Sequence, residues 1–241
     1  MQNWLALLVV FFSVFTQSLT GFGSGLVSMA FLPGMLGVRT AVPMVALITG
    51  TLELILLIRF RTAFNLKAVW RLALATLLGL PLGVWALRGV SEKILLPVLG
   101  LVMSGYALYA LFNLKLPRLE HPAWAYLAGF LSGVLSGAYS VGGPPVIIYG
   151  NCRGWEPDEF KSNLQGFFLL NDGLAIIYHG IAGNLTHAVW TGYLWALPAL
   201  GLGLLAASGL DRFLNPQIFR KLVLVLLVIM GIRFILIAFT G

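Results

Sequence analysis

Long stretches without a charged residue are the feature that most limits what this chain can fold into. Residues 1–38, 94–114, 121–152 and 173–210 contain no Asp, Glu, Lys or Arg. Crossing about 30 Å of hydrocarbon takes roughly 20 apolar residues in a helix, so each stretch is long enough for a membrane span. Only 10 % of the 241 residues are charged, against about 25 % in soluble domains. A water-soluble globular enzyme is therefore excluded.

Eight apolar segments predict an all-α polytopic membrane protein with about eight transmembrane helices. They cover residues 4–30, 40–58, 68–87, 94–112, 122–150, 162–183, 188–210 and 217–239. Tryptophans lie near most segment ends, where amphipathic rings settle at lipid headgroups. The first segment has no basic residues before it, so it is predicted to be a retained span and not a cleaved signal. We expect one integral membrane domain.

The two halves of the chain carry matching features, which indicates an internal repeat. Residues 24–25 align with 142–143 at an offset of 118 residues, and 49–51 align with 171–173 after a four-residue insertion. We expect three parts: a first four-helix repeat (1–115), a linker (116–121) and a second four-helix repeat (122–241). Four crossings per half would make the repeats parallel, whereas a segment that turns back midway would invert them. The sequence leaves both arrangements open.

The cations between the segments do not assign an orientation. If all eight segments cross, six Lys and Arg residues lie on one face and eight on the other. That difference is too small for the positive-inside rule to decide. The net charge of +7 comes from cations that sit singly or in small groups between segments. Loop anchoring explains them better than a nucleic acid partner does.

Two glycine-rich runs interrupt apolar segments. Residues 20–25 read Thr-Gly-Phe-Gly-Ser-Gly, and residues 142–145 read Gly-Gly-Pro-Pro. Because Gly costs about 1 kcal/mol and Pro about 3 kcal/mol in a helix interior, the first helix of each repeat is predicted to break at a Gly/Pro-rich hinge. Glycines in spans also permit close helix packing, which is the alternative interpretation. Adjacent prolines favour the break.

A broken helix within the membrane predicts an internal cavity, because unwound backbone in hydrocarbon needs partners from protein, water or a ligand. Restarted helices present free N–H groups and a positive dipole end, which suits an anion. The residues expected to bind the anion are Gly21, Gly23, Ser24, Gly25, Tyr139, Ser140, Gly142, Gly143, Pro144 and Asn171.

Two carboxylic acids inside apolar segments are the candidates for proton coupling. Asp172 lies eleven residues from Lys161 and eleven from Gly183, so it is roughly 16 Å from either helix end on a side chain too short to snorkel. We expect it to face the protein interior and to bind and release a proton during transport. A structural acid that is hydrogen-bonded through Asn171 is the alternative. Glu53 is the second candidate, although it could also reach the membrane interface.

At these runs the chain resembles the TauE/SafE family of sulfite exporters and sulfonate permeases. The matching pieces are residues 20–25 in the first half and 133–137, 141–145, Arg153 and 160–161 in the second. The resemblance implies a secondary transporter of sulfite, organosulfonates or related organic acids in the bacterial inner membrane, drawing on the proton gradient. Ser24 departs from the triple glycine that is usual in the family.

The predicted mechanism is alternating access, with a small anion bound between the two helix breaks near the bilayer midplane. The expected partners are the anion, protons and the lipid bilayer; a homodimer stays open, and nucleic acid is not expected. With a single Cys152 and no Cys/His cluster, the sequence predicts no metal and no cofactor. A passive anion channel is the closer alternative. An intramembrane serine hydrolase fits poorly, because Phe22 stands where a nucleophile elbow around Ser24 needs glycine.

Overall fold

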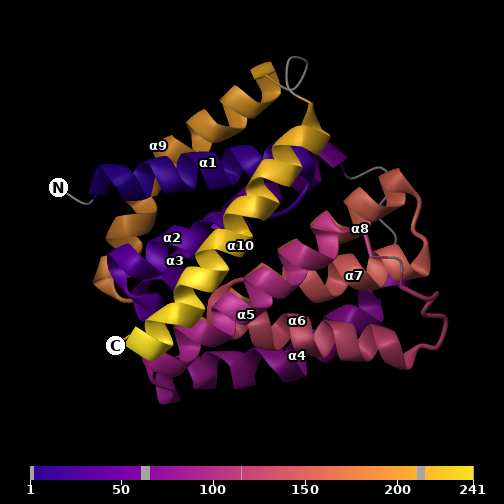
Figure 1. Cartoon of the computed structure of the whole chain (residues 1–241), viewed down its shortest axis with the longest axis horizontal. Coiled ribbons are helices and arrows are strands. Elements are labelled where there is room, and N and C mark those ends of the chain that lie inside the picture. The colour runs from indigo at the N-terminus through magenta and orange to yellow at the C-terminus, as the bar shows by residue number, and fades with distance from the viewer. Residues whose placement is uncertain (1–2, 61–65, 115, 211–214, 241) are drawn as a thin grey trace.

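A computed structural model describes residues 3–60, 66–114, 116–210 and 215–240 of the chain. Within these ranges it contains ten helices and no strand (Figure 1), which confirms the all-α prediction. The helices are α1 (Asn3–Thr20), α2 (Ser24–Leu36), α3 (Val38–Phe60), α4 (Leu66–Gly89), α5 (Glu92–Leu111), α6 (Ala123–Tyr139), α7 (Gly143–Arg153), α8 (Pro157–Ile181), α9 (His187–Leu210) and α10 (Pro216–Thr240). Each of the eight predicted segments coincides with one helix or with a pair.

Four stretches of the described helices are long and apolar enough to cross a membrane by themselves. They are Val38–Leu56, Leu66–Gly89, Glu92–Leu111 and His187–Leu210, and shorter apolar stretches form α2 and most of α1. These helices fit a polytopic membrane protein. The layout with eight crossings stays a prediction.

The chain leaves helical geometry at both glycine-rich runs, but it then turns back instead of continuing in the same direction. In Figure 1, α2 returns beside α1 and α7 returns beside α6. Hydrogen bonds fix the second return, because the Leu119 N–H donates to the Cys152 carbonyl at 3.3 Å and the Arg153 guanidinium donates to the Glu120 carbonyl at 3.2 Å. The expected broken helices are therefore two hairpins: the first hairpin (α1 and α2) and the second hairpin (α6 and α7).

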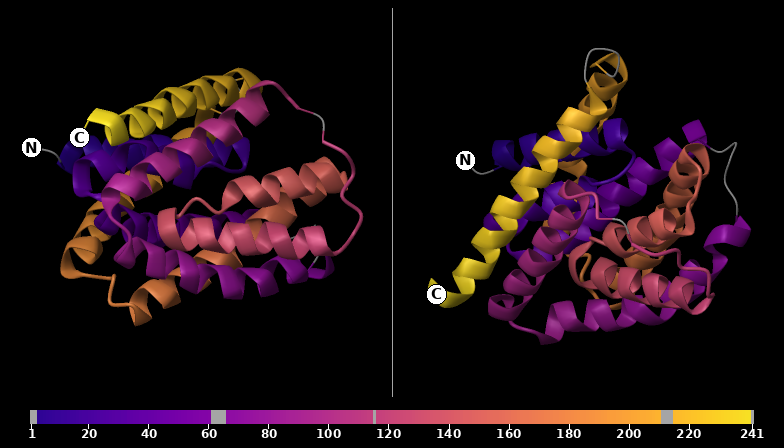
Figure 2. Two further views of the ribbon diagram at one scale, coloured as in Figure 1. Left: turned by 60° about the horizontal axis from the view of Figure 1, so that its bottom comes forward. Right: turned by 45° about the vertical axis from the view of Figure 1, so that its right-hand side comes forward.

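The two halves run in opposite directions along the bundle. At one end, the Val38 N–H donates to the Glu92 carboxylate at 3.2 Å, and the Arg88 guanidinium donates to the Ala182 carbonyl. This end holds the starts of α3 and α5 and the ends of α4 and α8. The opposite end holds the end of α5, the end of α7 and the start of α8 (Figure 2). Because the first segment of each half turns back as a hairpin instead of passing through the bundle, the second half is inverted relative to the first.

Glycines let the two halves approach closely. The main contacts between the halves are α4 with α6, α5 with α10, α1 with α9 and α3 with α8. A Cβ atom on Gly133 of α6 would lie 2.7 Å from the Thr76 carbonyl oxygen of α4, and the Thr76 hydroxyl donates to the Gly129 carbonyl at 2.9 Å. These glycines permit close helix packing, as small residues commonly do in membranes.

Replacing Gly133 with Ala should destabilise the protein, because the added methyl group would overlap the backbone of α4. Overpacking of this kind typically costs about 1–3 kcal/mol, so we expect a lower midpoint of thermal unfolding in detergent. Gly105→Ala on α5 is the matched control, since nothing lies within 4 Å of a Cβ atom there. Equal midpoints for the two variants would contradict the close contact between α4 and α6.

Candidate functional site

The tips of the two hairpins meet inside the bundle and border a cavity of about 40 Å³, which we call the central cavity. The first tip is formed by residues 21–25 and the second by residues 140–143. Pockets for drug-sized ligands occupy roughly 300–1,000 Å³. The central cavity therefore suits a ligand of only a few heavy atoms.

The first tip depends on two glycines with positive φ. Gly21 has a φ of 85° and Gly23 a φ of 108°, a backbone region that residues with a Cβ atom rarely adopt. The Thr20 hydroxyl lies 2.7 Å from the Phe22 carbonyl and 2.9 Å from the Thr16 carbonyl, so it ties the turn to α1. These bonds supply partners to backbone that has left the helix.

The second tip is held by serines. Ser140 ends α6 in the left-handed region with a φ of 51°, and its N–H donates to the Ser136 carbonyl at 2.8 Å. Its hydroxyl donates to the Val42 carbonyl of α3 at 2.8 Å, while the Ser132 hydroxyl donates to the Gly142 carbonyl at 2.6 Å. Prolines then occupy the first turn of α7, where a helix needs no N–H donor from them.

The two tips touch, and both restarted helices begin at the central cavity. A Cβ atom on Gly25 would collide with the Ser140 carbonyl oxygen, so only glycine fits there. The N–H groups in the first turn of a helix have no intrahelical acceptor, and the positive ends of two helix dipoles meet at this point. Gly25 of α2 and Gly143 of α7 carry such N–H groups, and both residues line the central cavity.

A buried glutamine fastens the first tip to α3. The Gln17 side-chain oxygen accepts hydrogen bonds from the Ser24 N–H at 3.0 Å and from the Ser24 hydroxyl. Its amide nitrogen donates to the Glu53 carboxylate. Glu53 is only 1 % exposed, and within the described part of the chain its second carboxylate oxygen has no hydrogen-bond partner. Glu53 therefore lies inside the protein and not at the membrane interface.

Asp172 of α8 faces Glu53 of α3 across the central cavity, which both residues line. Their carboxyl groups are close enough to interact electrostatically. The Asn171 amide donates to the Asp172 carboxylate at 3.2 Å and also donates to the Ser136 hydroxyl of α6. Two acids thus lie beside the proposed anion site, and Asn171 links one of them to the second hairpin.

Most of the residues predicted for the site line the central cavity. They are Gly23, Ser24, Gly25, Glu53, Ser140, Gly142, Gly143, Asn171 and Asp172. Gly21 lies outside this lining, and its carbonyl accepts a hydrogen bond from the Gln165 amide at 2.8 Å. Tyr139 is buried in the hydrophobic core, and Pro144 lines a separate apolar hollow. That the lining residues bind an anion stays a prediction.

Sequence reasoning missed several lining residues. Gln17 is the polar one with the clearest signal, because an amide inside a charge-free apolar segment needs hydrogen-bond partners when it is buried. Thr49 lies in the repeat alignment, although its contact with the cavity could not be inferred from that. The apolar members give no signal of their own; they are Phe22, Leu26, Val141, Ile147 and Phe168. Among the described residues, no group of three or more His, Cys, Asp or Glu residues could hold a metal ion.

Comparison with known proteins identifies relatives over most of the chain. The family model described as sulfite exporter TauE/SafE matches residues 6–234. A Cupriavidus necator protein named probable sulfite/organosulfonate exporter TauE is 24 % identical over 222 residues, which cover 89 % of this chain and 86 % of that protein. A Comamonas testosteroni protein named probable inner membrane transporter protein TsaS is 27 % identical over 169 residues, which cover 68 % and 71 %. No solved structure matches the chain.

Gln17→Leu should destabilise the protein, because it leaves the Ser24 N–H, the Ser24 hydroxyl and the Glu53 carboxylate without their amide partner. Unpaired buried polar groups cost about 1–3 kcal/mol each, so we expect a clear drop in the midpoint of thermal unfolding. Gln217→Leu makes the same change at an exposed position of α10 and serves as the control. A midpoint that does not differ between the two variants would show that Gln17 does not hold the tip.

Proposed function

Because this chain belongs to the sulfite exporter TauE/SafE family, we propose that it carries a small oxyanion, sulfite or an organosulfonate, across the bacterial inner membrane. The family and the relatives are named as exporters and transporters, and the chain is a transporter, not an enzyme. The substrate class follows from the name of the Cupriavidus relative. The proposed location in the inner membrane is inferred from the name of the Comamonas relative and from the apolar helices.

The observation that carries this proposal is the convergence of two helix N-termini on the central cavity. N–H groups at a helix start and the positive dipole end together favour an anion. The N–H groups of Gly25 and Gly143 are the proposed donors, whereas the Ser24 hydroxyl already donates to the Gln17 side-chain oxygen. Among the described residues, those that line the cavity include no Lys or Arg, so backbone dipoles are the source of attraction that we propose there.

We propose that Asp172 and Glu53 couple transport to protons. Both acids line the same cavity as the proposed donors. A carboxyl pair whose exposure to solvent changes between two conformations can bind a proton on one side of the membrane and release it on the other. Proton uptake and anion release would then share one conformational step. A passive channel would need no such pair beside its anion site.

The two inverted halves suit alternating access. Transporters with inverted repeats bind substrate near the membrane midplane and expose it to either side by rocking one part against the other. In this chain the two hairpins enter from opposite ends of the bundle and contact each other at their tips. We propose that each hairpin belongs to one repeat and that the remaining long helices α3–α5 and α8–α10 cross the membrane.

The inversion also assigns a proposed orientation. Among the cations whose side chains the structure describes, seven lie toward the end where α8 begins: Lys67, Arg71, Arg118, Arg153, Lys161, Arg220 and Lys221. Four lie toward the opposite end: Arg39, Arg88, Lys93 and Arg233. By the positive-inside rule we propose that the cation-rich end faces the cytoplasm. If all eight apolar segments crossed the membrane, the cations would divide almost evenly between the two faces, and no orientation would follow from them.

Asp172→Asn should abolish proton-driven accumulation and spare substrate exchange, because Asn retains the shape of the side chain but cannot carry the proton. The measurement is sulfite or sulfonate uptake into proteoliposomes, with and without an imposed pH gradient. Asp158→Asn, at an exposed position of the same helix, is the control. Accumulation by the Asp172 variant at the wild-type level would remove Asp172 from the coupling. A wild-type protein that moves none of these anions would refute the proposed function.

The orientation can be measured by cysteine labelling in a Cys152→Ser background. Ser91→Cys lies at the cation-poor end and Glu120→Cys at the cation-rich end, and both positions are exposed. We expect a membrane-impermeant maleimide to label the first variant in intact spheroplasts and the second only after permeabilisation. The reverse pattern would contradict the assignment.

A further inference from the structure

A polar hollow of about 530 Å³ opens at the cation-rich end. Its polar lining residues include Arg118, Arg220, Asn113, Asn151 and Tyr109. The hollow is larger than the central cavity and is lined by two arginines, whereas no described residue that lines the central cavity is an arginine. Planar guanidinium groups bind oxyanions well, because they can donate two parallel hydrogen bonds.

Arg220 connects the polar hollow to the first hairpin tip. It lines the hollow and also a much smaller cavity of about 10 Å³, which Phe22, Gly23 and Leu26 line as well. Those last three residues are also part of the lining of the central cavity. The polar hollow, the small cavity and the central cavity therefore lie in sequence. Arg220 lies at the junction of the first two, and Phe22 lies at the junction of the last two.

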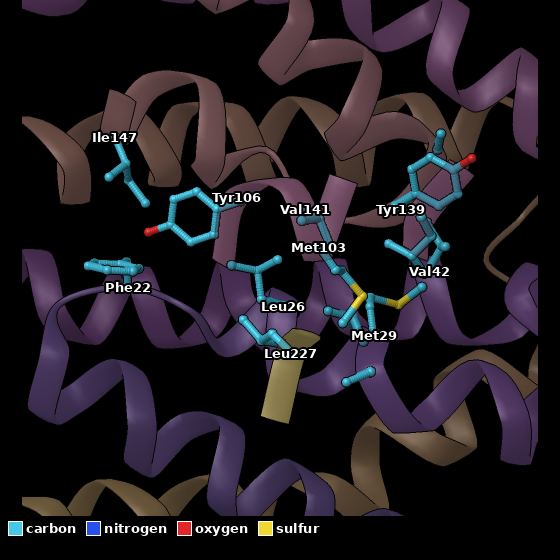
Figure 3. Packing of buried hydrophobic residues seen from close by; sticks show 14 of the residues in the cluster. Phe22, Leu26, Met29, Val42, Met103, Tyr106, Tyr139, Val141, Ile147 and Leu227 are labelled. Atoms are coloured by element: carbon cyan, nitrogen blue, oxygen red, sulfur yellow. The ribbon is translucent and has the colours of Figure 1, made fainter. Parts of the chain in front are cut away.

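Phe22 closes the second junction. Phe22 is 8 % exposed, and the guanidinium carbon of Arg220 lies 5.1 Å from the centroid of its ring. Tyr106 packs edge-on against the ring with centroids 6.3 Å apart, and in Figure 3 its hydroxyl points toward the gap between Phe22 and Ile147. A volume of about 10 Å³ holds about one water molecule. No oxyanion passes in this conformation.

Arg220 also has unused hydrogen-bonding capacity. Its Nε atom is buried and makes no hydrogen bond of good geometry within the described ranges, and neither does the hydroxyl of Tyr106, although Tyr106 lies close enough to Arg220 for the two side chains to interact. Buried donors without partners are uncommon and call for an explanation. Both residues line the small cavity that leads to Phe22. A ligand at this junction would supply the missing acceptor.

We propose that Arg220 forms an outer binding site for a small oxyanion, and that binding there releases Phe22 and opens the way from the polar hollow to the central cavity. This inference rests on the proposed transport of an anion. A charge-assisted hydrogen bond to an oxyanion is stronger than a cation–π contact with Phe, so an arriving anion replaces the ring as the partner of Arg220. Gly21 and Gly23 flank Phe22 with positive φ, and they give the ring the backbone freedom to move.

The test follows the Phe22 ring directly, by ¹⁹F NMR of protein that carries 4-fluorophenylalanine at position 22. Methanesulfonate is the probe, and the protein is the full chain in nanodiscs. We expect a saturable change in the ¹⁹F signal of the otherwise wild-type chain. Arg220→Gln should weaken the apparent affinity at least tenfold. Lys221→Gln removes an exposed cation from the next position of the same helix and should leave the response unchanged.

Each outcome of this experiment decides the proposal. A ¹⁹F signal that ignores methanesulfonate, sulfite and sulfate overturns it, as does an Arg220→Gln variant that responds like the wild type. Nanodiscs with and without anionic lipid separate a free anion from a lipid headgroup; a response to the lipid alone also overturns it. The readout needs no transport, so a chain that moves no sulfonate but shows the Arg220-dependent response would refute the proposed function and keep the outer site. Normal transport without that response would refute the outer site and keep the proposed function.

Discussion

Backbone N–H and C=O groups in the middle of a membrane must find partners, and this constraint explains the centre of the structure. The two hairpin tips place non-helical backbone inside the bundle, where lipid could not satisfy it. Side chains supply the partners instead: Gln17 binds the Ser24 N–H, Gln165 binds the Gly21 carbonyl and Ser132 binds the Gly142 carbonyl. The amide hydrogens left at the starts of α2 and α7 are the donors that we propose for an anion.

Close packing of the two halves surrounds this centre. The contacts of α4 with α6 and of α5 with α10 rely on glycine, since Cβ atoms on Gly133 or Gly100 would overlap the partner helix. Each of these pairs joins one helix from each half. Because the two halves run in opposite directions, one hairpin enters from each end of the bundle, and both hairpins reach the same central cavity.

The sequence was sufficient to place the helices, the two interruptions and most of the residues around the central cavity, because Gly, Pro and ionisable groups are conspicuous in apolar segments. It could not show that the chain turns back at each interruption. Glycine and proline break a helix whether the chain continues or reverses, and the reversal depends on contacts such as that between Leu119 and Cys152. The contact between Phe22 and Arg220 was likewise hidden, since it joins residues far apart in the chain.

The central claim is that backbone at the two hairpin tips binds an oxyanion. Selenite is a heavier analogue of sulfite, so an experimental structure with selenite would locate the anion by anomalous scattering. The account predicts a peak between residues 23–25 and 141–143, within hydrogen-bond distance of the Gly25 and Gly143 amides. Selenite found only in the polar hollow, or nowhere beside the tips at a concentration that supports transport, would contradict it.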